Sequence, residues 1–314
     1  MKIVFMGTPE FAVPSLEILL KNKYEVAAVV TAPDKPRGRG QQVSFTPVKE
    51  TALKHSLPLL QPSKLDGPDF VSSLTSIAPD LFVVVAFRIL PSKVFSIPTS
   101  GAFNLHASLL PKYRGAAPIN WAIINGEKES GVTTFFLQEK VDTGNVILQA
   151  RVAITEAMTA GELHDTLSEV GAEIVLQTVR LIELGKVNPR KQEDSLASPA
   201  PKIFKENCRI DWNRPTVNVR NFIRGLSPLP TAWAVHGDKI LKIYNTALLK
   251  EGDAGLTKQE MGPGSIAIQG NKQMFVATGA GFLEVLELQQ EGRKRMSVAE
   301  FLKGYTFEKG AKLG

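Results

Sequence analysis

Apolar runs alternate with amphipathic segments along residues 1–188. The apolar runs predict strands, which are expected at Lys2–Met6, Glu25–Thr31, Leu81–Phe87, Ala102–His106, Gly131–Leu137 and Val146–Ile154. Apolar positions at helical spacing predict helices, which are expected at 9–22, 46–54, 68–77, 117–125 and 159–184. Strands that alternate with helices in this way predict an α/β domain with a mostly parallel sheet.

Residues 205–314 follow a different pattern, in which glycines separate short apolar stretches. Strands are expected there at Trp233–His236, Lys239–Ala247, Gly264–Ala267, Met274–Ala277 and Phe282–Leu288. Many short strands without long helices between them predict a small β-barrel. Residues 189–204 have the proline and serine content of a linker. We therefore expect one domain at residues 1–188, a linker at 189–204 and a second domain at 205–314.

Composition limits the class of protein. A chain of 314 residues with 43% apolar content can bury two cores. It has no uncharged apolar run of about 18 residues, so we expect no membrane span. The N-terminus starts on a predicted strand without a signal-peptide pattern, which favours a cytoplasmic protein. Cys208 is the only cysteine and has no Cys or His cluster around it, so neither a disulfide nor a metal site is expected.

The excess positive charge lies in the second part of the chain. Residues 1–188 contain 18 Lys and Arg and 18 Asp and Glu, so their net charge is zero. Residues 189–314 contain 19 Lys and Arg and 13 Asp and Glu, so they carry the whole net charge of +6. A basic module joined to a neutral one favours a polyanionic partner, with nucleic acid as the leading candidate. A basic surface that serves only solubility is the alternative.

Two polar residues interrupt the predicted strand Ala102–His106. Asn104 and His106 are two positions apart, so both side chains project from the same face of the strand. The strand leads directly into a loop, and the carboxyl ends of strands in open α/β sheets are where reaction sites form. An amide and an imidazole at this place predict such a site. A buried pair whose members satisfy each other's hydrogen bonds is the alternative.

The segment Pro33–Gln42 contains two prolines, two glycines and three basic residues. This composition predicts an exposed, mobile loop that does not pack. Its cations, Lys35, Arg37 and Arg39, are candidates for phosphate contacts. A solvated surface loop without a partner is the alternative.

Three motifs together resemble the folate-dependent formyltransferases. They are Asn104-x-His106, then His106-x-Ser108-Leu109-Leu110-Pro111-x-Tyr113-Arg114-Gly115, and Asp142-Thr143-Gly144. The stretches Phe5–Phe11 (FMGTPEF) and Gly292–Met296 (GRKRM) are similar to those of the members that act on methionyl-tRNA. The resemblance extends from residue 2 to about residue 304. It implies a Rossmann-like formyltransferase domain with a mostly parallel sheet, followed by an OB-like β-barrel domain that binds tRNA.

The resemblance also implies that Asn104, His106 and Asp142 are the catalytic residues. Formyl transfer to an amine passes through a tetrahedral intermediate with negative charge on oxygen. Asn104 can donate a hydrogen bond to this oxygen, and His106 can move a proton near neutral pH. Asp142 can hold the imidazole and stabilise its cationic form. Because the attacking amine is itself the nucleophile, we expect direct transfer without an acyl-enzyme.

The co-substrate implied by the resemblance is 10-formyltetrahydrofolate, and the acceptor is methionine on initiator tRNA. Folate contacts are expected at Ser108, Leu109, Leu110 and Pro111, and at Phe87, Arg88 and Ile89. Contacts with tRNA are expected at Lys35, Arg37 and Arg39, and at Arg293, Lys294 and Arg295. Residues 86–91 read Ala-Phe-Arg-Ile-Leu-Pro where the family usually has Ala-Tyr-Gly-x-Ile-Leu-Pro, so the backbone beside the pterin pocket is expected to differ. We expect a monomer without an obligate protein partner.

Several other functions stay open from the sequence. A glycinamide ribonucleotide formyltransferase would share the polar trio, but it should have a glycine-rich phosphate loop at the first turn and no basic C-terminal module. A sugar-nucleotide formyltransferase has a second domain but lacks the motif Gly7–Phe11. A formyl-folate hydrolase would direct water at the same carbon. A non-catalytic RNA-binding protein would need only the excess positive charge of residues 189–314, and not the polar trio.

Overall fold

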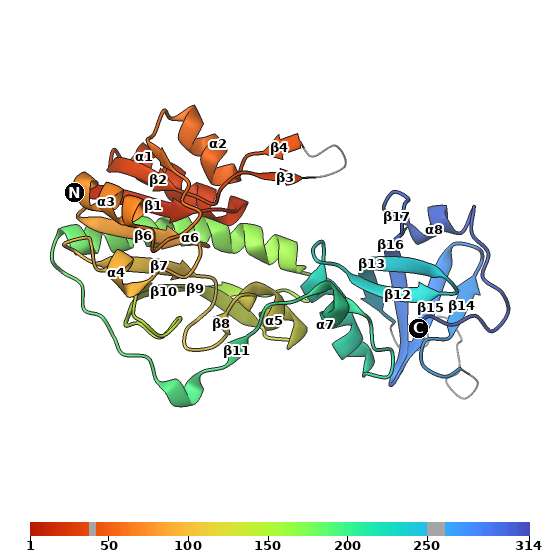
Figure 1. Ribbon diagram of the computed structural model, residues 1–314. Helices are drawn as coiled ribbons and strands as arrows, with labels where there is room; N and C mark the ends of the chain where they lie inside the picture. Colours follow the sequence, from red (N-terminus) through yellow and green to blue (C-terminus); the bar gives the residue numbers. More distant parts are fainter. Residues whose placement is uncertain (38–41, 250–260) are drawn as a thin grey trace. The chain divides into compact units, whose positions relative to one another are not determined.

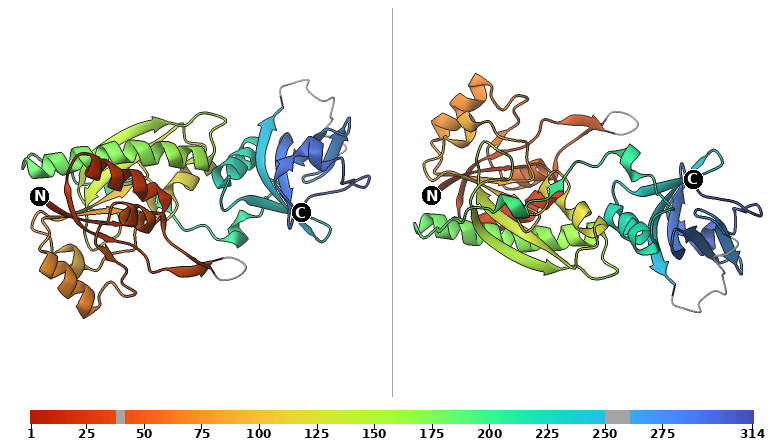
Figure 2. Two further views of the ribbon diagram at one scale, coloured as in Figure 1. Left: turned by 90° about the horizontal axis from the view of Figure 1, so that it is seen from above. Right: turned by 90° about the horizontal axis from the view of Figure 1, so that it is seen from below.

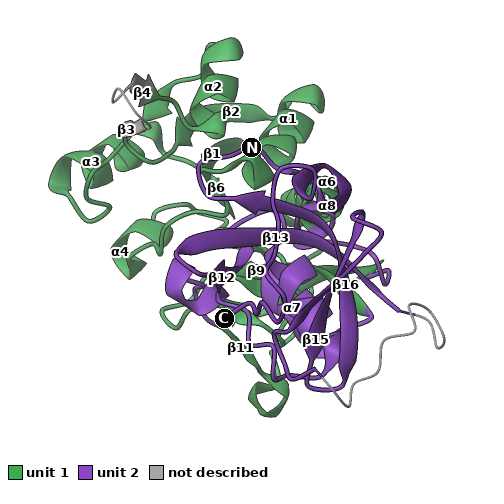
Figure 3. Cartoon of the chain, turned by 90° about the vertical axis from the view of Figure 1, so that its right-hand side faces the viewer, with its two compact units in different colours: residues 1–118, 129–153, 164–200 green, residues 119–128, 154–163, 201–314 purple. Residues whose placement is uncertain are grey.

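The computed structural model describes residues 1–37, 42–249 and 261–314, and the chain forms two compact units (Figure 3). Unit 1 comprises residues 1–118, 129–153 and 164–200. Unit 2 comprises residues 119–128, 154–163 and 201–314. Unit 1 therefore extends past the predicted boundary at 188, and unit 2 takes residues from both sides of the boundaries at 188 and 205. Those boundaries stay a prediction about independently folding parts.

Unit 1 is built on one mixed sheet (Figure 1). In the order in which they pair, its strands are β10 (Val146–Ala153), β9 (Glu129–Phe136), β7 (Ala102–His106), β6 (Leu81–Val85), β1 (Lys2–Gly7), β2 (Glu25–Val30) and β5 (Leu59–Leu60). The five strands from β7 to β5 are parallel, whereas β9 is antiparallel to β7 and β10 is antiparallel to β9. The prediction of an α/β domain with a mostly parallel sheet is confirmed.

Helices cover both faces of this sheet (Figure 2). The helices that contribute to unit 1 are α1 (Val13–Lys21), α2 (Pro47–Lys54), α3 (Pro68–Ile77), α4 (Ser92–Phe95), the start of α5 (Pro118–Ile124) and most of α6 (Ala160–Glu183), with short 3-10 turns at Glu10–Ala12 and Asp194–Leu196. On one face, Val4 and Met6 of β1 pack in a cluster with Phe70 and Leu74 of α3. The opposite face contacts α6, because Gly171 lets that helix approach Leu105 closely. Alternate residues of the central strands are thus buried on opposite sides.

The basic segment after β2 contains strands, whereas its composition predicts a loop; its expected exposure and mobility stay predictions. Its backbone forms a hairpin, in which β3 (Lys35–Arg37) pairs antiparallel with β4 (Gln42–Ser44). Some backbone N–H and C=O groups of this segment therefore bond to each other, although the segment is rich in prolines and glycines. The side chains of Lys35 and Arg37 are not described, and Arg39 lies outside the described residues.

Unit 2 contains an antiparallel sheet. In pairing order its strands are β12 (Ala232–His236), β13 (Lys239–Leu248), β16 (Gly281–Gln290), β15 (Gln273–Thr278) and β14 (Ile266–Gln269), with β17 (Met296–Ser297) beside β16. The other regular elements of its described part are a 3-10 turn at Lys205–Cys208, α7 (Thr216–Leu226), α8 (Val298–Phe301), most of α5 and the first residues of α6. The expected strand-rich second module is confirmed, and its classification as an OB-like barrel stays a prediction.

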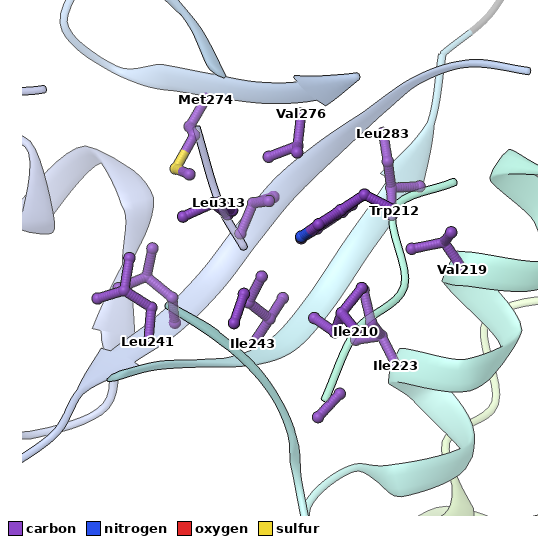
Figure 4. Packing of buried hydrophobic residues seen from close by; sticks show 14 of the residues in the cluster. Ile210, Trp212, Val219, Ile223, Leu241, Ile243, Met274, Val276, Leu283 and Leu313 are labelled. Carbon is purple, nitrogen blue, oxygen red and sulfur yellow. The ribbon is translucent and has the colours of Figure 1, made fainter. Parts of the chain in front are cut away.

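Apolar side chains from the strands, from α7 and from the C-terminus form the core of unit 2 (Figure 4). Trp212 lies among them, with Leu283 of β16 and Ile223 of α7 in the same cluster. Leu313 belongs to this core too, although it is the penultimate residue of the chain. Among the helices that the structure describes, none has the length and apolar character needed to cross a bilayer.

Replacing Leu283 by alanine should lower the free energy of unfolding of unit 2 by about 2–5 kcal/mol, because a fully buried leucine leaves a cavity. Leu286 of the same strand is 38% exposed, so Leu286→Ala is the matched control and should have a much smaller effect. Trp121, Trp212 and Trp233 all belong to unit 2, so tryptophan fluorescence in urea measures this unit. Equal losses in both variants would contradict the burial of Leu283 in the core of unit 2.

Candidate active site

The polar residues of the predicted site lie around the carboxyl end of β7. Because β1, β2, β6 and β7 are parallel, the loops that follow them begin at the same edge of the sheet. Asn104 pairs with Val84 of β6, and His106 is the last residue of β7. This edge is the usual place for a ligand site in an open α/β sheet.

His106 is buried, and both of its ring nitrogens face polar groups. Its Nε2 lies 2.8 Å from the carbonyl oxygen of Tyr113. A carbonyl can only accept, so Nε2 carries the hydrogen and donates it. Nδ1 then holds the lone pair of the neutral ring, and it lies 3.9 Å from Asp142 Oδ2. The ring is therefore oriented by the loop that follows β7.

Asp142 reaches this place because its loop folds back along the sheet. The loop leaves β9 beside Ala102, at the start of β7, where Leu137 N–H donates to the Ala102 carbonyl. Asp142 nevertheless lies next to His106, at the end of β7. Its Oδ2 accepts a hydrogen bond of 2.9 Å from the backbone N–H of Gly115, and its backbone is left-handed, with φ of 55°. The position of the carboxylate is thus fixed both by the hydrogen bond from Gly115 and by the left-handed backbone of Asp142.

Asn104 lies two residues before His106 and is partly buried. Among the described residues, no hydrogen bond joins its side chain to His106 or to any other group. The two residues therefore do not satisfy each other, in contrast to the alternative considered from the sequence. The amide of Asn104 keeps two N–H donors for another molecule.

The loop Ser108–Pro111 is held by residues of the antiparallel strands. The hydroxyl of Thr133 donates to the Ser108 carbonyl at 2.6 Å and accepts from the Leu110 backbone N–H at 3.1 Å. Gln149 Nε2 donates to the Leu110 carbonyl at 2.9 Å and to the same hydroxyl. Ser108 uses its own hydroxyl to donate to the Lys112 carbonyl at 2.6 Å. The backbone of this loop is consequently fixed beside His106.

The structure also brings to the site a segment that the sequence presented as linker. Ser198 accepts a hydrogen bond from the Tyr113 N–H, and β8 (Arg114–Gly115) pairs in parallel with β11 (Pro199–Ala200). Gln192 bonds to the side chain of Arg114 and to the backbone of the Asp142 turn. The sequence does not predict these contacts, because polar side chains between prolines have no pattern that distinguishes a segment bonded to the site from a solvated linker.

Phe87, Arg88 and Ile89 occupy the loop after β6, at the same edge of the sheet. Phe87 packs partly into the core, whereas Ile89 is 72% exposed. The Arg88 guanidinium donates to the carbonyls of Pro62 and Ser63, at 2.7 and 3.1 Å, and burial lowers the pKa of Arg88. In this chain the arginine that departs from the family pattern ties its loop to the segment after β5.

The C-terminal candidates Arg293, Lys294 and Arg295 lie in unit 2, between β16 and β17. All three are exposed. Arg295 forms an ion pair with Glu287 and lies over the ring of Tyr244, 4.3 Å from its centroid. Hydrogen bonding to Glu287 raises the pKa of Arg295. Among the described residues, no group of three or more His, Cys, Asp or Glu side chains could hold a metal ion.

Replacing Thr133 by valine should destabilise unit 1 by about 1–3 kcal/mol, because the Leu110 N–H and the Ser108 carbonyl lose a buried partner without a change in side-chain shape. Urea unfolding followed by circular dichroism would measure the loss. Thr75→Val is the matched control, since the Thr75 hydroxyl is exposed and donates to the Val71 carbonyl one turn earlier in its own helix. If both variants unfold alike, Thr133 does not hold the loop.

Comparison with known proteins covers the whole chain. The formyl transferase model matches residues 1–179, and the model of the formyl transferase C-terminal domain matches residues 202–306. A methionyl-tRNA formyltransferase from Flavobacterium johnsoniae is 49% identical, over all of this chain and 99% of that protein. A methionyl-tRNA formyltransferase from Acetivibrio thermocellus is 45% identical, over all of both chains.

Solved structures share the fold at lower identity. An N-formyltransferase from Helicobacter canadensis, in complex with folinic acid and dTDP-3-aminofucose, has a TM-score of 0.65 and 21% identity, over 94% of this chain and all of that one. HypX from Aquifex aeolicus, in complex with tetrahydrofolic acid, has a TM-score of 0.65 and 20% identity, over 98% of this chain and 48% of that one. With both domain models matched in order and full-length relatives near half identity, the chain belongs to the formyl transferase family.

Proposed function

We propose that this chain transfers the formyl group of 10-formyltetrahydrofolate to the α-amino group of methionine on initiator tRNA, for translation initiation. The observation that carries the proposal is the convergence of Asn104, His106 and Asp142, in a member of this family whose full-length relatives are named methionyl-tRNA formyltransferases. The amine attacks the formyl carbon directly, and the tetrahedral intermediate then collapses. The bond between the formyl carbon and N10 of the folate breaks, and N10 takes up the proton that the amine lost, so that tetrahydrofolate leaves. No serine or cysteine nucleophile is required.

His106 is suited to receive the proton that the attacking amine loses. Its Nε2–H is already donated to the Tyr113 carbonyl, so Nδ1 is the basic nitrogen of the neutral ring. A proton taken up at Nδ1 creates an imidazolium 3.9 Å from the Asp142 carboxylate. The negative charge stabilises this cation, and the Gly115 N–H keeps the carboxylate in place.

Asn104 is suited to stabilise the oxygen of the reacting formyl group. Its amide projects from the same strand face as His106 and has no hydrogen bond among the described residues. Donors that are already in position when negative charge develops give large rate effects. The folate supplies the formyl group. The residues at this edge of the sheet fit a folate, since the exposed Ile89 offers it an apolar contact and Asn104 offers a hydrogen-bond donor to its formyl group.

Binding of tRNA is assigned to the basic residues. Arg293, Lys294 and Arg295 are exposed on unit 2, where phosphates can reach them. We assign Lys35, Arg37 and Arg39 of the segment Pro33–Gln42 to the same substrate, on the strength of their charge alone. A monomer in the cytoplasm, without an obligate protein partner, completes the proposal.

One assay decides the function. The protein is incubated with methionyl initiator tRNA and 10-formyltetrahydrofolate, and formylated methionine is sought by mass spectrometry. Formylation that depends on charged tRNA is expected. Folate turnover without an amine acceptor would indicate a hydrolase instead, and tRNA binding without any transfer would indicate a binding protein.

Replacing Asn104 by alanine should lower kcat by roughly two to three orders of magnitude, because it removes a donor aimed at the developing oxyanion. Single-turnover formylation with saturating substrates would measure the change. Asn22→Ala is the matched control, because Asn22 caps the end of α1, which lies toward the opposite edge of the sheet. A kcat for Asn104→Ala within a few-fold of the wild type would contradict the role of this amide.

Replacing Lys294 by alanine should weaken tRNA binding for all tRNA sequences and reduce the slope of log affinity against log salt by about 1. Filter binding at several salt concentrations would measure the slope. Lys21 is also exposed but lies at the end of α1 in unit 1, so Lys21→Ala should leave the slope unchanged. Unaltered binding by Lys294→Ala would remove this residue from the proposed surface.

A further inference from the structure

We propose that Gln192 is a positioning residue for the reaction, acting through Asp142. The inference rests on the proposed function, and it concerns a residue in the segment that has the composition of a linker. Gln192 belongs to unit 1 and is only 6% exposed, although its neighbours Lys191 and Glu193 are exposed. A buried amide in such a segment needs partners, and its partners are parts of the site.

The side-chain amide of Gln192 is fully used. Its Oε1 accepts two hydrogen bonds from the Arg114 guanidinium, from Nε at 3.1 Å and from Nη2 at 2.8 Å. Its Nε2 donates to the backbone carbonyls of Asp142 and Gly144, both at 2.8 Å. An amide has two donor hydrogens and two acceptor lone pairs, and all four are engaged here. The side chain therefore has one allowed orientation.

These contacts close a ring around the Asp142 carboxylate. Gln192 holds the backbone of Asp142 and also the side chain of Arg114. The next residue, Gly115, donates its N–H to Asp142 Oδ2. Gln192 therefore supports both partners of the Gly115–Asp142 hydrogen bond, one through the Asp142 carbonyl and the other through the Arg114 side chain. Loss of Gln192 removes these two supports, whereas the pairing of β8 with β11 and the ion pair between Arg114 and Asp194 remain.

The backbone near Gln192 is itself fixed. Two residues earlier, Arg190 exchanges a pair of backbone hydrogen bonds of 2.8 Å with Val146, the first residue of β10. Gly144 has no room for a side chain, because a Cβ there would lie 1.6 Å from the Phe136 carbonyl oxygen. The turn that carries Asp142 is therefore clamped between β9 and the Gln192 amide. This geometry leaves the carboxylate little freedom to shift.

Two replacements of Gln192 separate positioning from folding. Gln192→Leu removes all four hydrogen bonds. Gln192→Glu keeps the acceptor for Arg114 but places an oxygen against the carbonyls of Asp142 and Gly144. Both should lower kcat by about 10- to 100-fold, because a shift of about 1 Å in a reacting group has an effect of this size. The KM values for folate and for methionyl-tRNA should change less than threefold. Ser195→Ala is the matched control, since Ser195 is exposed in the same segment and, within the described residues, its hydroxyl bonds only to Glu193.

A double-mutant cycle with Asp142→Ala tests whether Gln192 acts through the carboxylate. Single-turnover formylation is measured for each single variant and for the double variant, with thermal melting as the check on folding. If Gln192 acts by positioning Asp142, replacing Gln192 in the Asp142→Ala variant should lower the formylation rate less than threefold. If the two single-variant losses in formylation rate multiply in the double variant, the proposal is overturned. A wild-type kcat in Gln192→Glu would also overturn it.

Failure of the proposed function is a separate outcome. If the wild-type protein does not formylate methionyl-tRNA, the proposed function is wrong, whereas the proposal about Gln192 is refuted only by variants of an active wild type.

Discussion

The hydrogen bond from the Gly115 N–H to the Asp142 carboxylate is the contact on which the arrangement of the site depends. It joins the loop that follows β7 to the loop between β9 and β10, and these loops start at opposite ends of β7. The carboxylate oxygen that accepts it, Oδ2, is also the one that lies 3.9 Å from His106 Nδ1. The loop after β7 also orients that ring, through the carbonyl of Tyr113. One loop thus sets the direction of the imidazole and the position of its anionic neighbour.

The sheet explains why such a contact can form. Its parallel strands gather the loops after β1, β2, β6 and β7 at one edge, which is where folds of this type bind ligands. The antiparallel pair β9 and β10 adds a loop that returns from the other edge. Thr133 and Gln149, which belong to this pair, also support the backbone after β7. The antiparallel strands therefore support the loop after β7, although Asn104, His106 and Asp142 all lie outside them.

The sequence was a good guide where burial decided the structure. Strands such as β6 are apolar throughout, and α3 has the predicted bounds because its apolar spacing is regular. Asn104 and His106 could be paired from their spacing alone, since the period of a strand fixes which side chains share a face. The proximity of Asp142 could not be predicted from spacing, because it depends on a loop that folds back over several residues. The contacts of Gln192 with the Asp142 turn could not be predicted either, since its partners there are backbone carbonyls, which every residue has.

Unit 2 draws on three separate stretches of the chain, and this has a consequence for synthesis on the ribosome. The Asn120 amide donates to the Gly225 carbonyl, and the Gly161 N–H donates to the Ser227 carbonyl, so early residues wait for partners that are translated much later. The last residue, Gly314, exchanges backbone hydrogen bonds with Val235. Residues 119–128 and 154–163 therefore cannot complete unit 2 until residues 201–314 have emerged from the ribosome.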